Sequence, residues 1–210
     1  TVTPTISLFT PTGELVDHDP AIAKARWALQ PAWVREGPIM SFANGPGADV
    51  LAANIRASIR KIHAAGGKIV VGTDSPFTPI GINTHNELVQ EVKAGLTPFE
   101  ALRSATAVPA EPLGQGKDLG TVEPGKIADL VFVKGNPLDD IKDASKVRKV
   151  MKTGRLYTIE ELLTMRQVLG ASPALAQQSD PGATQVEDII VTATKREERL
   201  IDVPVAVTAV

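Results

Sequence analysis

The sequence lacks cysteine altogether, and this absence excludes several kinds of site. Without thiols the chain forms no disulfide, offers no thiolate nucleophile and holds no zinc through sulfur. Histidine is scarce as well, because only His18, His63 and His85 occur, and none stands in an H-x-H or H-E-x-x-H pattern. We therefore do not expect a metal site built from the histidines of this chain alone.

An excess of charge of either sign is also missing. The 210 residues carry 22 Lys and Arg against 24 Asp and Glu, a net charge of -2, so the composition does not favour binding to nucleic acid. No apolar run approaches the roughly 18 residues that a membrane-spanning helix needs. The first residues, "TVTPTISLFTPTG", include no starting methionine and no basic segment, and we expect them to begin inside a longer protein.

What is present is the pattern of an α/β unit. "VTPTI" (2–6) predicts a short strand, and "KIVVGT" (68–73) predicts a buried one. Between them we expect a helix from about Ala21, interrupted at Pro31, and a second helix within 48–67 that ends at a glycine pair. A helix followed by glycines and an apolar strand is typical of α/β folds.

Two capping boxes are predicted in the helices that follow. Thr84 and Glu87 stand at T-x-x-E spacing, and Thr97 and Glu100 repeat that spacing. From Leu113 onward, short β-branched stretches separated by glycines predict a small β layer. "TIEELL" then predicts a further capped helix.

Asp74 is the first candidate for chemistry. It directly follows the buried strand 68–73, and the carboxyl end of a parallel strand is where α/β folds bind ligands. A carboxylate there can ligate a divalent cation, or carry a proton from an attacking water to a leaving group. Aspartate also starts turns by accepting hydrogen bonds from the backbone that follows it. From the residues alone, both interpretations stay open.

Four stretches of the chain carry a resemblance to a known family. They are "GGKIVVGTDSP", "THNELVQEVKAGLTPFEALRSAT", "LGTVEPGKIADLVFVKGNPLDDI" and "VRKVMKTGRLYTIEELL", in this order. Together they resemble the C-terminal part of the amidohydrolase superfamily, in its imidazolonepropionase-like and Xaa-Pro dipeptidase-like branch. The resemblance runs from Thr1 to about Leu163.

The resemblance implies an α/β fold, the C-terminal portion of a metal-dependent hydrolase with a (β/α)8 barrel. "VTPTI" would be the seventh barrel strand and "KIVVGTD" the eighth. Residues 1–112 would then form part of the barrel, and residues 113–164 part of a composite β-sandwich with a closing helix.

The same resemblance implies a role for Asp74 as metal ligand and proton carrier. Metal-activated water would attack a C–N bond in a small amide, a dipeptide or a cyclic amide. Ser75 and His85 are weaker candidates, for contact with the substrate or support of a metal ligand. The family's divalent metal is usually zinc, and its other ligands come from earlier barrel strands that this chain does not contain. Since catalytic zinc needs three or more protein ligands, we expect the chain alone to bind no metal and to be inactive.

The last part of the chain differs in composition. Residues 165–187 are rich in Ala, Gln, Ser and Pro and predict a flexible linker. From about residue 171, "ASPALAQQ" followed by "VEDIIVTATKREERLIDVPVAVTAV" resembles the cleavage region and mature N-terminus of a TonB-dependent outer-membrane receptor, with residues 188–210 as the start of its plug. That resemblance implies TonB as a partner, and the periplasm or cell envelope of a Gram-negative bacterium as the location. We interpret the chain as two gene fragments joined near residues 164–171.

Two other hypotheses stand beside the hydrolase fragment. In the first, the chain acts as a TonB-interaction or plug segment of a receptor, and its first part is incidental. In the second, it is a structural α/β module without a site.

Overall fold

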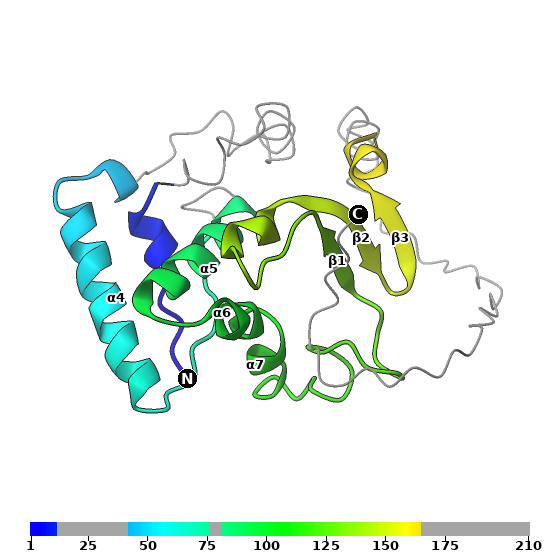
Figure 1. The fold of residues 1–210 in the computed structure, drawn as a ribbon, viewed down its shortest axis with the longest axis horizontal. Helices are drawn as coiled ribbons and strands as arrows, with labels where there is room; N and C mark the ends of the chain where they lie inside the picture. Colours follow the sequence, from blue (N-terminus) through cyan, green and yellow to red (C-terminus); the bar gives the residue numbers. More distant parts are fainter. Residues whose placement is uncertain (12–41, 76–80, 165–210) are drawn as a thin grey trace, which may run out of the picture.

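The computed structural model of the chain describes residues 1–11, 42–75 and 81–164. The helix expected from Ala21, the predicted linker and the receptor-like tail lie outside these residues. Helices α4 to α7 occupy one side of the described part, and a three-stranded sheet occupies the other (Figure 1). No helix in these three ranges is long and apolar enough to cross a membrane.

The elements alternate between short helical turns, longer helices and strands. In chain order they are η1 (Ile6–Phe9), η2 (Phe42–Asn44), α4 (Ala48–Ala64), α5 (Ile82–Ala94), α6 (Pro98–Ser104), α7 (Ala107–Ala110), β1 (Leu130–Val133), η3 (Ile141–Ser145), β2 (Val147–Lys152) and β3 (Arg155–Thr158). Residues 159–164 are helical as well, as "TIEELL" predicts.

The two predicted parallel strands meet, but only at one bridge. Val2 pairs with Ile69 in parallel, and the Val70 N–H donates to the Val2 carbonyl over 2.9 Å. The next donor, the Val71 N–H, bonds instead to the Ser104 carbonyl at the end of α6, over 3.1 Å. The prediction of regular strands at 2–6 and 68–73 is therefore wrong in extent, because a helix end takes the place of a neighbouring strand.

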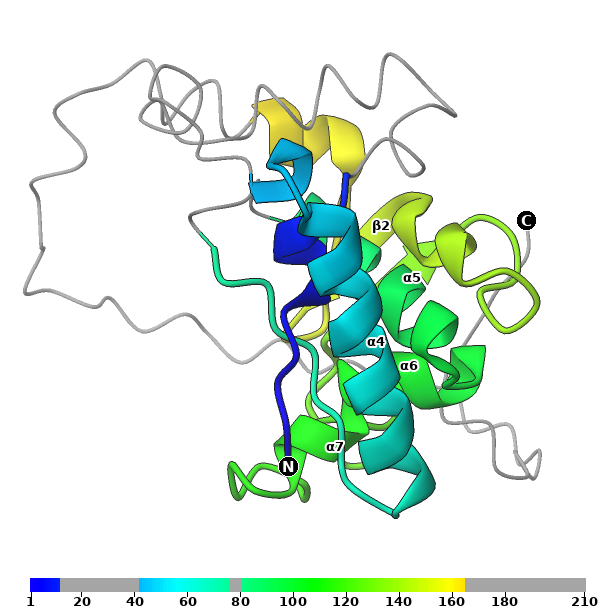
Figure 2. The same ribbon diagram turned by 90° about the vertical axis from the view of Figure 1, so that its left-hand side faces the viewer.

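An apolar core joins these segments to the helices. Its buried members come from η1, α4, the Ile69 segment and the end of α5, and are Ile6, Ala52, Ile59, Ile69, Ala94 and Leu96. Figure 2 shows the N-terminal segment running alongside α4, and η1 contacts both α4 and α5. The prediction of a buried strand at 68–73 therefore holds only for Ile69, since Val70 to Thr73 are half-buried and Lys68 is exposed.

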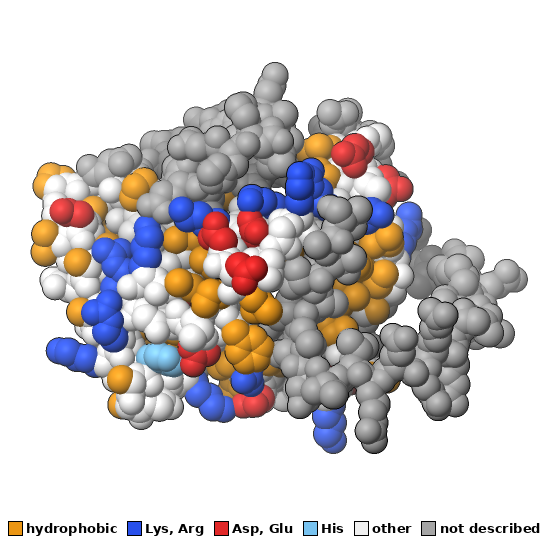
Figure 3. All heavy atoms as spheres, in the orientation of Figure 1, with side chains coloured by type: hydrophobic (Ala, Val, Ile, Leu, Met, Phe, Trp, Pro, Cys, Tyr) orange, Lys and Arg blue, Asp and Glu red, His pale blue; other side chains and the backbone are white. Residues whose placement is uncertain are grey.

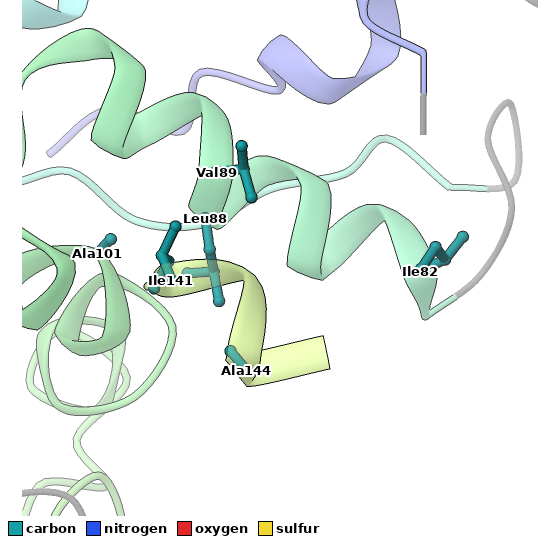
Figure 4. Close-up of a cluster of buried hydrophobic side chains, with 6 residues drawn as sticks. All are labelled: Ile82, Leu88, Val89, Ala101, Ile141 and Ala144. Carbon is teal, nitrogen blue, oxygen red and sulfur yellow. The ribbon is translucent and has the colours of Figure 1, made fainter. Parts of the chain in front are cut away.

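A second core lies on the other side of α5. Leu88 and Val89 of α5 pack with Ala101 of α6 and with Ile141 and Ala144 of η3 (Figure 4). Because α5 contributes to both cores, it is the central helix of the described part. Of its thirteen residues, Lys93 is the one classed as exposed.

One of the two predicted capping boxes is present. The Glu100 N–H donates to Thr97 Oγ1, and the Thr97 N–H donates to the Glu100 carboxylate, at the start of α6. The box predicted at Thr84 and Glu87 is wrong, because α5 begins at Ile82 and the Glu87 side chain turns away into the interior.

The β layer is an antiparallel sheet in the order β1-β2-β3. The pairing aligns two apolar rows across the strands: Val131, Val150 and Tyr157, and Leu130, Met151 and Leu156. Successive residues of a strand point to opposite faces, so both faces of this sheet carry apolar side chains. Figure 3 shows hydrophobic side chains gathered over the sheet on one side. Val131 in one row is 54% exposed, and Leu156 in the other is 44% exposed.

The Ile59→Ala substitution is expected to lower the free energy of unfolding by about 2–5 kcal/mol, since it leaves a cavity beneath α4. Ile59 is 2% exposed, whereas Val50, on the same helix, is 59% exposed. Val50→Ala is therefore the matched control, with an expected change below about 0.5 kcal/mol. Urea unfolding measures both. Equal effects would show that α4 packs through a different face.

Candidate functional site

Asp74 ends the second of the two paired segments. It is exposed, and its φ of 50° lies in the left-handed region. Aspartate tolerates this conformation better than most residues, and there it terminates an extended segment sharply. The flanking hydroxyls are close, with Thr73 Oγ1 and Ser75 Oγ 3.1 Å apart. The carboxylate thus stands at the carboxyl end of its segment.

The end of the first segment lies directly against the second. A Cβ atom at Gly72 would come within 2.1 Å of Thr3 Cγ2 and 3.1 Å of Thr5 Cγ2, so only glycine permits this approach. Thr5 also has a left-handed conformation, with a φ of 47°. Each segment therefore ends in a non-glycine residue of positive φ, and the two ends are neighbours.

The weaker candidates occupy different places. Ser75 is exposed in the same turn as Asp74, whereas His85 is half-buried in the first turn of α5. Within the described ranges, no group of three or more His, Asp or Glu side chains is arranged to hold a metal ion. The described residues therefore do not fit a metal site by themselves, and a single exposed carboxylate is too few ligands.

The least expected feature is a buried polar face on α5. It consists of Asn83, Asn86, Glu87, Gln90 and Glu91, all with side chains removed from solvent. We refer to these residues as the polar face of α5. They follow helical spacing, one turn after another, and they face η1, α4 and α6 rather than water.

A hydrogen-bonded chain crosses this face from α4 to η1. Arg56 Nη1 donates to Gln90 Oε1 over 2.9 Å, and Gln90 Nε2 donates to Asn86 Oδ1 over 3.3 Å. Asn86 Nδ2 then donates to Thr10 Oγ1 over 3.0 Å. Buried polar groups are costly unless they are paired, so this series of hydrogen bonds fixes how α4, α5 and η1 pack together.

Glu87 binds the backbone of η1. Its Oε1 accepts from the Ile6 N–H over 3.0 Å, and its Oε2 accepts from the Ser7 N–H over 2.6 Å. Burial raises the pKa of Glu87 above its ordinary value, while the two N–H groups oppose that rise. Both oxygens act as acceptors, so the contacts suit the ionised carboxylate.

Glu91, one turn further along α5, has the opposite environment. Its Oε2 lies 2.5 Å from Ser104 Oγ, which in turn lies 2.7 Å from the Ala101 carbonyl oxygen. The hydroxyl has one hydrogen and the carbonyl only accepts, so a protonated Glu91 that donates to Ser104 satisfies both contacts. Burial raises the pKa of Glu91 to about 8, the charge of Glu87 adds to the rise, and the Ser104 hydrogen bond opposes it.

The polar face of α5 was not predicted from the sequence. Positions 83, 86, 87, 90 and 91 read as the solvent side of an amphipathic helix, with Leu88, Val89 and Val92 as the buried side. The apolar side and the polar side of α5 together cover almost the whole circumference of the helix, and both are removed from solvent. Lys93 is the exposed residue of α5. A helix with so little surface has neighbours on every side.

Comparison with known proteins identifies the family. Residues 35–157 match the amidohydrolase family, which is more than half of the chain. The chain therefore belongs to the amidohydrolase family.

Individual relatives extend the similarity. The chain is 38% identical over 98 residues to the ochratoxinase of Aspergillus niger, covering 44% of this chain and 20% of that protein. It is 33% identical over 92 residues to an imidazolonepropionase of Geobacillus sp., covering 41% and 21%. The chain thus spans about a fifth of the length of these curated relatives.

A solved structure supports the fold over a longer stretch. A Xaa-Pro dipeptidase with bound methionine in its active site superposes with a TM-score of 0.53 and 32% sequence identity. The match covers 74% of this chain and 34% of the dipeptidase. Most of the described α/β arrangement is therefore shared with part of that enzyme.

The Glu91→Gln variant is expected to gain stability relative to the parent chain as the pH rises from about 4.5 to about 8. An unfolded glutamate loses its proton near its ordinary pKa, whereas folded Glu91 keeps it up to about 8, so raising the pH in this window destabilises the parent. The glutamine side chain of the variant cannot ionise, and its amide can still donate to Ser104. The difference in unfolding free energy should grow by roughly 1 kcal/mol per pH unit.

Urea unfolding of both proteins across this pH window measures the difference. Parallel pH profiles of the two proteins would show that Glu91 does not retain its proton in the folded chain.

Proposed function

We propose that this chain is the C-terminal portion of a metal-dependent amidohydrolase that cleaves a C–N bond with water. Membership in the amidohydrolase family supports the proposal, together with similarity to a Xaa-Pro dipeptidase and an imidazolonepropionase. By resemblance the substrate is a small amide, a dipeptide or a cyclic amide, and the metal is zinc. We treat the structural module without a site as the weaker hypothesis, because the chain belongs to the amidohydrolase family.

The observation that carries the proposal is the position of Asp74. Asp74 is exposed at the carboxyl end of a segment that is anchored by the buried Ile69, and one parallel bridge joins Ile69 to Val2 of the first segment. Open α/β sheets and (β/α)8 barrels bind their substrates at this end of the strands. We assign Asp74 the role of proton carrier, which accepts a proton from the attacking water and delivers it to the leaving nitrogen.

The proposal assigns the remaining site to residues outside this chain. The described residues offer no cluster that could hold a metal ion beside Asp74. The chain covers 34% of the dipeptidase, so the ligands that complete the site would come from the other part of such an enzyme. Hydrolysis therefore requires both parts, and TonB binding and an envelope location stay predictions for the tail from residue 165.

A chimera tests the role of Asp74. Residues 1–163 would replace the matching part of the Xaa-Pro dipeptidase, and the product is expected to hydrolyse a Xaa-Pro dipeptide when a divalent metal is supplied. Asp74→Asn in the chimera should lower kcat/KM by about a hundredfold or more, because the proton carrier is lost. Asp118→Asn, an exposed aspartate outside α5 and the paired segments, is the matched control. A folded chimera that keeps full activity after the Asp74→Asn substitution would contradict the assignment.

The isolated chain should behave differently from the chimera. We expect purified residues 1–210 to take up less than one equivalent of zinc and to leave a Xaa-Pro dipeptide intact, because one carboxylate cannot hold the metal. Metal analysis after dialysis and a product assay measure both properties. If the isolated chain bound one equivalent of zinc and hydrolysed the dipeptide, the claim that it needs residues from outside would be wrong.

A further inference from the structure

The turn at Thr5 is a backbone conformation that needs external support. Threonine is β-branched, and a φ of 47° is unfavourable for such a residue. A conformation of this kind persists where surrounding contacts over-determine it, and it commonly occurs near functional sites. Thr5 itself is half-buried, and the two residues after it are buried, since Ile6 is 0% exposed and Ser7 1% exposed.

The support comes from two consecutive residues of α5. Glu87 accepts from the N–H groups of Ile6 and Ser7, at the start of η1. Asn86 donates to the carbonyl oxygen of Thr10 over 3.3 Å and to its hydroxyl over 3.0 Å, at the end of η1. Both ends of this short turn are therefore bound to one helix.

The same turn touches the segment that carries Asp74. A Cβ atom at Gly72, two residues before Asp74, would come within 3.1 Å of the Thr5 methyl group, and within 2.1 Å of the methyl group of Thr3 beside it. A change in the Thr5 turn therefore alters the contact beneath the Asp74 backbone. Helix α5, which supplies Glu87, is also the next described element after Asp74 in the chain. Glu87 therefore supports the turn that contacts the segment before its own helix.

We propose that Glu87 is a positioning residue, whose carboxylate holds the left-handed turn at Thr5 against Gly72 and thereby fixes the backbone that presents Asp74. The proposal rests on the proposed function only where it treats Asp74 as part of a reaction site. The contacts among Glu87, Thr5 and Gly72 are independent of that reaction.

Amide hydrogen exchange in the full chain, followed by NMR, tests this role. In Glu87→Gln, the side-chain amide would place its own N–H against a backbone N–H, so the exchange of Ile6 and Ser7 should become about tenfold to hundredfold faster. The backbone amide resonance of Asp74 should shift as well. Glu91→Gln is the matched control on the same helix, and it should leave all three signals close to those of the parent.

A purely structural role for Glu87 gives a different result. If Glu87→Gln accelerates every buried amide by the same factor, or leaves Ile6 and Ser7 unchanged, the proposal is overturned. Should this variant fail to fold, Glu87→Asp decides, because it keeps the charge and is too short to reach both N–H groups. Faster exchange at one of the two amides, Ile6 or Ser7, then supports the proposal. Exchange at both amides at the rate of the parent chain overturns it. The two proposals fail separately. An inactive chimera would overturn the hydrolase proposal, whereas the exchange rates of Ile6 and Ser7 test the positioning role of Glu87 whatever the chimera does.

Discussion

Two carboxylates buried one turn apart on α5 are the constraint on which this structure depends. They do not ionise independently, because the charge of Glu87 raises the pKa of Glu91. The helix meets this constraint with different partners, since Glu87 accepts from two backbone N–H groups and the Glu91 carboxyl group is hydrogen-bonded to the Ser104 hydroxyl. The Ser104 carbonyl in turn accepts from the Val71 N–H of the Asp74 segment. One helix thus joins the first segment, the Asp74 segment and α6.

Polar and apolar contacts have different roles in the packing around α5. Apolar packing on both sides of α5 is non-directional and stabilises the arrangement without setting the register of each turn. The hydrogen bonds of the polar face are directional and bind individual backbone groups. The carboxyl ends of the paired segments, where Asp74 lies, are therefore placed by polar contacts within an apolar frame. This division suits a family whose chemistry depends on the exact placement of a few side chains.

Sequence reasoning succeeded where the determining contacts are local. The capping box of Thr97 and Glu100 is complete within four residues, and it was predicted correctly. Glu87 stands at the same spacing from Thr84, yet it binds Ser7, 80 positions away in the sequence. Of the segment 68–73 only Ile69 is buried, and the segment forms one bridge, because a strand needs neighbours that its own sequence cannot specify. The position of Asp74 followed from the apolar run before it, and the polar face of α5 did not follow from any local pattern.

Side-chain carboxyl titration by 13C NMR tests the central claim most directly, namely that α5 holds one ionised and one protonated carboxylate. In the folded chain near pH 6.5, the account predicts the chemical shift of a carboxylate for Glu87 and of a neutral acid for Glu91, with Glu91 titrating at about 8. The Glu91→Gln spectrum assigns the signals. Ionised forms of both residues at that pH would contradict the account, because Ser104 would then have one hydrogen for two acceptors.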